Sequence, residues 1–400
     1  MKKIELLAPA GDLEKLKIAV LYGADAVFVG SKEFSLRSRA SNFTINDLKE
    51  GAKFCHEHNA KLYVTTNIVP HNSDLIGLID YLQELEEAKV DAIICSSYAV
   101  MYIAKRYTNL EVHISTQQSV TNSKTVQFYY DYGATRVVLA RELSIEQIEE
   151  IKKNTDAELE VFIHGGMCSS YSGRCMLSNH MTNRDANRGG CAHSCRWNYD
   201  LFMGDELISD KDKFQFSSKD LMAVRQIERL IDCADSLKIE GRMKSIHYIA
   251  TVTKVYRMLI DEYYEKGRIE DHEYYKKEIE KAENRLFSHG FLNGMTTVKE
   301  QLYNMRSENP TQDFVGIVLN YDKESKKACV EVRNHFKPNS TLEAFGPNLR
   351  STKFKIGTIL DKDGNELDAA RHPKQHVYID CEFELAPYDM IRLVGKEWTQ

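Results

Sequence analysis

The chain has 400 residues, of which 42% are hydrophobic, 10% are aromatic and only 7 are proline. This composition excludes a disordered protein and allows one large domain with a smaller one. Lys and Arg number 53 against 59 Asp and Glu, and the net charge of -6 excludes nucleic-acid binding through bulk positive charge, so any such contact must be local. The apolar runs are shorter than the ~20 residues that span a bilayer, and the first residues lack the apolar region of a signal peptide. We therefore expect a cytoplasmic protein without membrane association.

Up to about residue 265, short β-branched runs alternate with stretches of helical periodicity. Strands are expected at 4–8, 26–30, 61–66, 92–95, 111–115, 136–140, 160–164 and 236–240. Helices are expected at 12–22, 45–58, 73–88, 98–107, 123–132, 144–153, 218–232 and 246–264. Eight such pairs predict the α/β class and a (β/α)8 barrel of the TIM type. The alternative is an open doubly wound sheet, which the lack of a Gly-x-Gly-x-x-Gly after any strand disfavours.

The sequence predicts three parts. Residues 1–268 form the barrel, which is the expected catalytic domain, and residues 269–309 form a connector with a helix at 272–288. From residue 310 to 400 the pattern changes to short alternating strands, which predicts a small all-β, barrel-like domain. These strands are expected at 314–319, 328–332, 341–345, 355–359, 376–379 and 390–394.

The regular alternation breaks once, after the seventh strand, in a loop that contains four of the nine cysteines. Barrel enzymes build their active sites on such loops at the carboxyl ends of strands. Within residues 165–200 the cysteines have the spacing C-x6-C-x15-C-x3-C, at Cys168, Cys175, Cys191 and Cys195. In a reducing compartment this cluster indicates a metal site rather than disulfides. The irregular spacing favours a 4Fe-4S cluster over zinc, because only the last pair is spaced as in a zinc ribbon, and four unrelated thiols are the third possibility.

Several segments together resemble one known family. They include Ala8-Pro-Ala-Gly, His113-Ile-Ser-Thr-Gln, Val161-Phe-Ile-His-Gly, the loop that ends in Gly190-Cys-Ala-His-Ser-Cys-Arg-Trp, and Lys238-Ile-Glu-Gly-Arg. Over essentially its whole length the chain resembles the collagenase-like peptidase family U32, and most closely its tRNA hydroxylation branch.

The resemblance implies a 4Fe-4S enzyme that hydroxylates the wobble uridine of certain tRNAs to 5-hydroxyuridine, with prephenate as co-substrate and without molecular oxygen. It implies that the four clustered cysteines are the cluster ligands. The partners are then the anticodon loop of tRNA, prephenate and, as a further expectation, an accessory protein or a second copy of the chain.

Polar residues near the expected carboxyl ends of the strands are the candidates for chemistry. The candidates for acid-base catalysis are His113, His164 and Glu240. The candidates for substrate binding are Arg37, Arg39, Asn67, Gln117, Arg141, Lys238 and Arg242. Guanidinium groups suit the two carboxylates of prephenate or a tRNA phosphate, and histidine titrates near neutral pH. A structural ion pair for each arginine and a hydrogen-bonded core position for each histidine remain open.

Two other functions remain open. The first is hydrolysis of collagen, as the family name suggests, but neither His-Glu-x-x-His nor Gly-x-Ser-x-Gly occurs in the sequence. The second is a non-catalytic tRNA-binding protein that carries a cluster.

Overall fold

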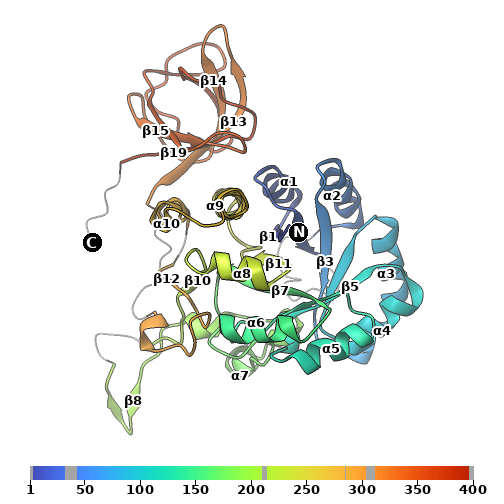
Figure 1. The fold of residues 1–400 in the computed structure, drawn as a ribbon. Coiled ribbons are helices and arrows are strands. Elements are labelled where there is room, and N and C mark those ends of the chain that lie inside the picture. The colour runs from blue at the N-terminus through green and yellow to red at the C-terminus, as the bar shows by residue number, and fades with distance from the viewer. Residues whose placement is uncertain (1–2, 32–42, 210–213, 284, 303–310, 396–400) are drawn as a thin grey trace.

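The computed structural model describes residues 3–31, 43–209, 214–283, 285–302 and 311–395. Eight parallel strands follow one another around a closed barrel, because the last of them, β11, pairs with both β1 and β7. The barrel strands are β1 (Glu5–Pro9), β2 (Ala26–Gly30), β3 (Lys61–Thr66), β4 (Ala92–Cys95), β5 (Glu111–Ile114), β6 (Arg136–Val138), β7 (Glu158–Gly165) and β11 (Ser236–Ile239). The predicted barrel is confirmed (Figure 1).

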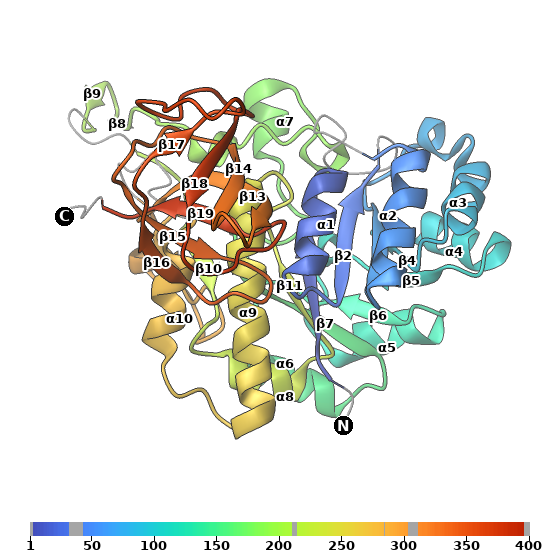
Figure 2. The same ribbon diagram turned by 90° about the horizontal axis from the view of Figure 1, so that it is seen from above.

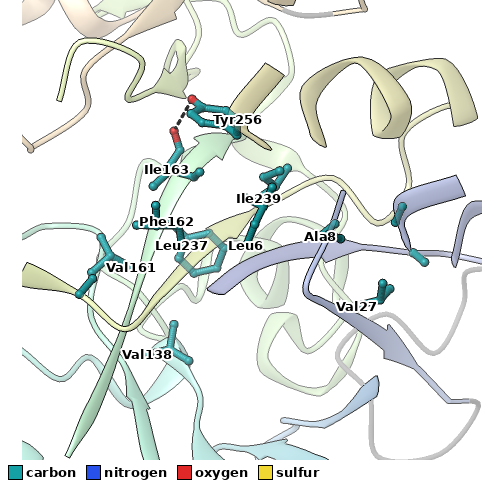
Figure 3. Close-up of a cluster of buried hydrophobic side chains, with 14 of the residues drawn as sticks. Leu6, Ala8, Val27, Val138, Val161, Phe162, Ile163, Leu237, Ile239 and Tyr256 are labelled. Carbon is teal, nitrogen blue, oxygen red and sulfur yellow. Dashed lines mark hydrogen bonds between the residues drawn. The ribbon is translucent and has the colours of Figure 1, made fainter. Parts of the chain in front are cut away.

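Helices cover the outside of the barrel (Figure 2). They are α1 (Leu13–Leu21), α2 (Ile45–Glu57), α3 (Leu78–Glu87), α4 (Tyr98–Tyr107), α5 (Ser123–Asp131), α6 (Ile145–Lys153), α8 (Ile227–Cys233) and α9 (Ile246–Lys266). Several begin at a residue whose side chain caps the first turn, as Asp12 does for α1 and Ser144 for α6. Their apolar faces and the outer faces of the strands form the main core. In Figure 3, Tyr256 of α9 donates a 3.0 Å hydrogen bond to the carbonyl oxygen of Ile163 in β7.

Four predicted elements differ from the structure. The helix expected at 218–232 is wrong at its start, because strand β10 (Asp220–Met222) runs antiparallel to β7 there and the helix begins only at Ile227. The helix expected at 73–88 is broken, since Gly77 has a φ of 77° between a short 3-10 helix, η1 (Asn72–Leu75), and α3. The helix expected at 272–288 ends early: α10 is His272–Ile279, and β12 (Phe287–Ser288) pairs with β10. The strand expected at 355–359 is two strands, β16 (Thr352–Lys355) and β17 (Ile359–Leu360).

The C-terminal part is an antiparallel seven-stranded sheet with its own core. Its other strands are β13 (Asp313–Asp322), β14 (Lys327–Val332), β15 (Thr341–Phe345), β18 (His376–Asp380) and β19 (Met390–Leu393). This sheet rests on α9 and α10 (Figure 1). Ile317, Phe345 and Met390 belong to the main core of the barrel, so the two parts share a buried apolar interface.

None of the described helices has the length and apolar character needed to cross a membrane.

Candidate active site beneath the cysteine loop

The loop after β7 is fixed over the carboxyl end of the barrel by contacts with three neighbouring strand-to-helix loops. It contains α7 (Leu177–Thr182) and the 3-10 helices η3 (Ala186–Arg188) and η4 (Ser194–Arg196). Arg188 pairs with Asp74 after β3 at 2.6 Å, and Glu142 after β6 accepts hydrogen bonds from the backbone N and Oγ of Ser172 at 2.9 and 3.1 Å. The loop therefore covers the mouth of the barrel.

Gly173 brings the backbone of this loop close to the barrel. Its φ is +73°, and a Cβ there would lie 2.0 Å from the carbonyl oxygen of Gln117 in η2 (Thr116–Gln118), which follows β5. Only glycine fits such a position without displacing the backbone. The predicted substrate-binding residue Gln117 thus lies directly under the cysteine loop.

Two predicted arginines form the floor of the mouth. Arg242, which is buried after β11, donates a 3.3 Å hydrogen bond from Nη1 to Oγ1 of Thr65 near the end of β3. These two strands are not neighbours in the sheet, so Arg242 reaches across the barrel opening. Arg141 follows β6, lies 4.1 Å above the ring of Phe162 and donates a 2.6 Å hydrogen bond to the carbonyl oxygen of Gly166. The structure thus brings both guanidinium groups to the predicted face of the barrel.

The four cysteines are thiols that lie on this loop, with Cys168 and Cys191 exposed and Cys175 and Cys195 half-buried. Burial raises the pKa of Cys195, the adjacent Arg196 lowers it, and the thiols of Cys168 and Cys191 raise it further. Three of the four thiols are therefore close enough to interact electrostatically. Within the described ranges, no group of three or more His, Cys, Asp or Glu side chains is arranged to hold a metal ion. The soft thiolate chemistry of four cysteines on one loop suits an iron-sulfur cluster.

Several arginine nitrogen atoms in and beside the loop lack hydrogen-bond partners. In the described part of the chain, Nε of Arg141, Nε of Arg184, Nε of Arg188 and Nη1 of Arg196 are buried and donate to no hydrogen-bond acceptor. Arg196 and Arg141 both approach the end of β7, since Nη2 of Arg196 donates to the carbonyl oxygen of Met167 at 3.4 Å. Buried N–H donors that lack acceptors are costly, so this side of the mouth favours an anionic ligand.

The other predicted residues at the mouth are Asn67 and Glu240. Nδ2 of Asn67 donates to Oγ of Ser115 at 3.4 Å, which links the ends of β3 and β5. Glu240 follows β11, and its backbone N donates to the carbonyl oxygen of His164 at 2.9 Å. Arg37 and Arg39 lie outside the described residues.

The predicted location of His113 and Lys238 at the mouth is wrong. The buried ring of His113 contacts the ring of Tyr63 and lies 3.6 Å from the carboxylate of Glu111, the first residue of β5. Lys238 pairs inside the barrel with the fully buried Glu160 at 2.7 Å. Both belong to a polar network inside the barrel.

This network crosses the barrel interior. Arg136 at the start of β6 pairs with Glu5 of β1 at 2.5 Å and with Glu158 and Glu160 of β7 at 2.8 and 3.2 Å. Burial lowers the pKa of His113, which keeps its ring neutral beside these charges. Since β1 and β6 are not adjacent, the network stabilises the closed barrel rather than the mouth.

His164 lies behind the barrel wall. A shift of register between β7 and β11 places it among the rings of Tyr248 and Tyr256 of α9 and Phe287 of β12. Its Nδ1 is 3.3 Å from Oη of Tyr256. The expectation that it lines the mouth is therefore also wrong.

Two residues of the mouth were not predicted from the sequence, Thr65 and Glu142. Thr65 positions Arg242, and Glu142 anchors Ser172 of the cysteine loop. Both come at or just after the end of a barrel strand, and that position was the signal that could have identified them.

The fold and the site together define a class of protein, a closed parallel barrel whose mouth is covered by a loop rich in cysteine and arginine. Residues 11–302 match the family model described as Peptidase family U32, and residues 310–392 match its C-terminal domain. The chain belongs to peptidase family U32, as its sequence motifs indicated.

Three relatives show the range of names in this family. The chain is 49% identical over 400 residues to "tRNA hydroxylation protein P1" of Bacillus subtilis (strain 168), with 98% of this chain and 95% of that protein covered. It is 38% identical over 370 residues to an uncharacterized protease of Methanocaldococcus jannaschii, with 86% and 88% covered. It is 37% identical over 260 residues to the Escherichia coli (strain K12) 23S rRNA 5-hydroxycytidine C2501 synthase, with 65% of this chain and 39% of that enzyme covered.

Proposed function

We propose that this protein is an RNA hydroxylase, and specifically a tRNA hydroxylase that converts the wobble uridine to 5-hydroxyuridine. The observation that carries the proposal is the four-cysteine loop fixed over a barrel mouth floored by Arg141 and Arg242. The names of two relatives support the reaction class, because one concerns tRNA hydroxylation and the other hydroxylation of a cytidine in rRNA.

The reaction replaces the hydrogen at C5 of the uracil ring with a hydroxyl group, which is a two-electron oxidation. The side chains at the mouth can neither accept these electrons nor supply the oxygen atom, so the reaction requires a co-reactant that takes up two electrons and brings an oxygen atom, and we propose prephenate for this role. We propose that Cys168, Cys175, Cys191 and Cys195 ligate a 4Fe-4S cluster, which would supply electron transfer at the mouth. The unpartnered guanidinium nitrogens around the loop support this assignment, because they can offset the negative charge of thiolates and sulfides.

The protein's own groups at the mouth would bind and orient the reactants. Arg141 and Arg242 are fixed donors in a partly buried site, and we propose that they bind the carboxylates of prephenate, in a reaction that does not require molecular oxygen. Neutral polar groups nearby, among them Asn67 and Gln117, can form hydrogen bonds with the polar edge of the uracil ring. The base would leave its stacked position in the RNA to enter the mouth.

The test is hydroxylation of a defined RNA. Protein reconstituted anaerobically with iron and sulfide is incubated with unmodified tRNA and prephenate, and the nucleosides are analysed by mass spectrometry. We expect 5-hydroxyuridine only when the protein, the tRNA and prephenate are all present. Hydrolysis of gelatin by the same preparation, without any new nucleoside, would instead support a peptidase.

A further inference from the structure

Helices α4 and α5 carry an exposed aromatic surface that the barrel does not use for packing. On α4, Tyr98, Tyr102 and Arg106 follow one another at intervals of four residues, and on α5 the same interval relates Lys124, Phe128 and Tyr132. Residues four apart lie on one face of a helix, so each set forms a stripe. Tyr102 is 63% exposed and Tyr132, directly after α5, is 67% exposed.

The two stripes form one continuous surface, which we call the α4–α5 aromatic surface. The rings of Tyr98 and Phe128 contact edge to face at 6.1 Å, and Phe128 lies 4.6 Å from Tyr132. Nη1 of Arg106 is 3.4 Å from Oη of Tyr102. The surface therefore offers several ring faces to solvent beside cationic groups.

This surface begins at the rim of the proposed active site. Tyr98 is three residues beyond the end of β4, and the hydroxyl of its stacked neighbour Tyr129 donates a 2.9 Å hydrogen bond to Gln118 beneath the cysteine loop. Arg174 of that loop donates to Oγ of Ser119 at 3.2 Å and is exposed. An RNA chain that leaves the mouth on this side would therefore reach the aromatic rings next.

The charges around the rings distinguish the partner. Helix α4 has Lys105 and Arg106 but no acidic residue, and the single acidic residue of α5, Asp131, is bonded to Gln127 at 2.7 Å. A second exposed apolar group, on the hairpin of β8 (Phe202–Met203) and β9 (Glu206–Leu207), has the opposite character, since residues 200–208 contain three acidic residues and no basic one. Exposed rings beside cations are typical of surfaces that bind single-stranded nucleic acid by stacking and phosphate contacts.

We propose that the α4–α5 aromatic surface binds the unpaired nucleotides that flank the target base of the RNA substrate. The inference rests on the proposed function for the identity of the RNA, and it assigns the contact to Tyr98, Tyr102 and Phe128, with phosphate contacts by Arg106 and Lys124. The flanking bases stack on the rings while the target base enters the mouth.

The experiment measures the affinity of the full-length protein for a fluorescent RNA stem-loop by anisotropy at several salt concentrations. We expect Tyr102→Ala and Phe128→Ala each to weaken binding about tenfold. Arg106→Gln and Lys124→Gln should each reduce the slope of log affinity against log salt by about 0.7. The matched control is Phe202→Ala on the acidic hairpin, where the side chain is 56% exposed, and its affinity should equal that of the wild type.

Wild-type affinity and salt slope in all four variants would overturn the inference. If those variants instead lost a self-association seen by sedimentation, while RNA binding stayed unchanged, the surface would belong to a contact between two copies of the chain. Hydroxylation that persists unchanged in the variants at subsaturating RNA contradicts this inference but not the proposed function. RNA binding that depends on the surface, without hydroxylation by any preparation, contradicts the proposed function alone.

Discussion

The side chain of Arg392 in β19 donates a 2.8 Å hydrogen bond from Nε to Nε2 of His247 in α9. Arg392 is fully buried, and its other nitrogens donate to Glu343 of β15 at 3.0 Å and to Thr251 of α9 at 2.7 Å. Its guanidinium also stacks 3.6 Å from the ring centre of Phe345. One side chain thus joins the C-terminal sheet to the barrel through three hydrogen bonds inside an apolar interface.

Replacement of Arg392 should therefore destabilise the whole chain. We expect Arg392→Leu to lower the free energy of unfolding by about 3 kcal/mol, because the buried Glu343 keeps Lys281 but loses Arg392 as an ion-pair partner. Urea denaturation followed by circular dichroism measures this change. The control, Arg371→Leu, breaks an exposed pair with Asp368 and should change stability by less than about 1 kcal/mol. Equal effects of both substitutions would show that Arg392 does not hold the interface.

His247 should make this interface sensitive to acid. It accepts a hydrogen bond at Nε2, burial lowers its pKa, Glu283 opposes the shift and Arg392 adds to it, so the folded protein holds the neutral ring. Because the pKa of His247 is lower in the folded protein than in the unfolded chain, the unfolded chain binds the proton at a higher pH. The free energy of unfolding therefore decreases as the pH falls below about 6.5, the ordinary pKa of histidine. The loss approaches about 1.4 kcal/mol per pH unit for one such group. His247→Gln keeps an acceptor without the titration, and we expect its urea midpoint to fall less steeply than that of the wild type between pH 7 and 5. Parallel slopes for the two proteins would contradict this assignment.

The four loop cysteines should each be required for iron. We expect Ala substitution of Cys168, Cys175, Cys191 or Cys195 to reduce iron, labile sulfide and visible absorbance after anaerobic reconstitution, because each iron of the proposed cluster needs one thiolate. Cys233→Ala is the control, since that thiol is buried in α8 and burial raises its pKa to about 12. A loop variant that keeps its full iron content would remove that cysteine from the ligand set.

We expect Arg242 to bind a carboxylate of prephenate through two parallel hydrogen bonds from its planar guanidinium group. Arg242→Lys keeps the positive charge but cannot make two parallel hydrogen bonds to a carboxylate, so we expect it to lose nearly as much prephenate-dependent hydroxylation as Arg242→Ala. The loss of a charge-assisted hydrogen bond, ~1.5 to 3 kcal/mol, corresponds to about one to two decades in affinity. The assay is the Michaelis constant for prephenate, with iron content as the check on folding. Full activity in the lysine variant would indicate that only the charge matters.

Lys238 should be required for stability instead of turnover. We expect Lys238→Met to cost about 3 to 5 kcal/mol of unfolding free energy, because it leaves the carboxylate of Glu160 buried with fewer cations. Adding Glu160→Gln should recover part of this loss, since the double variant removes the uncompensated charge. Thermal or urea unfolding of the single and double variants gives the coupling energy. A stable Lys238→Met protein that has lost hydroxylation would return Lys238 to the substrate site.

The sequence by itself determined the barrel and the cysteine loop. Parallel strands buried on both faces need continuous runs such as Ala26-Val-Phe-Val-Gly, and these runs are visible without knowledge of their neighbours. The loop was evident because its length and its clustered cysteines interrupt a regular alternation. Arg141 and Arg242 were placed at the correct end because each comes after the last residue of its strand.

Only the tertiary structure decided which way the remaining polar groups face. His113 and Lys238 are each the third residue of a four-residue strand, and their contacts depend on partners far away in the chain, such as Tyr63 and Glu160. Likewise, Arg136 meets Glu5 across the interior only because the sheet closes, and these residues are 131 positions apart. A charged side chain can be buried only where the tertiary fold brings an opposite charge next to it. The local periodicity of the sequence does not show which distant residue that will be.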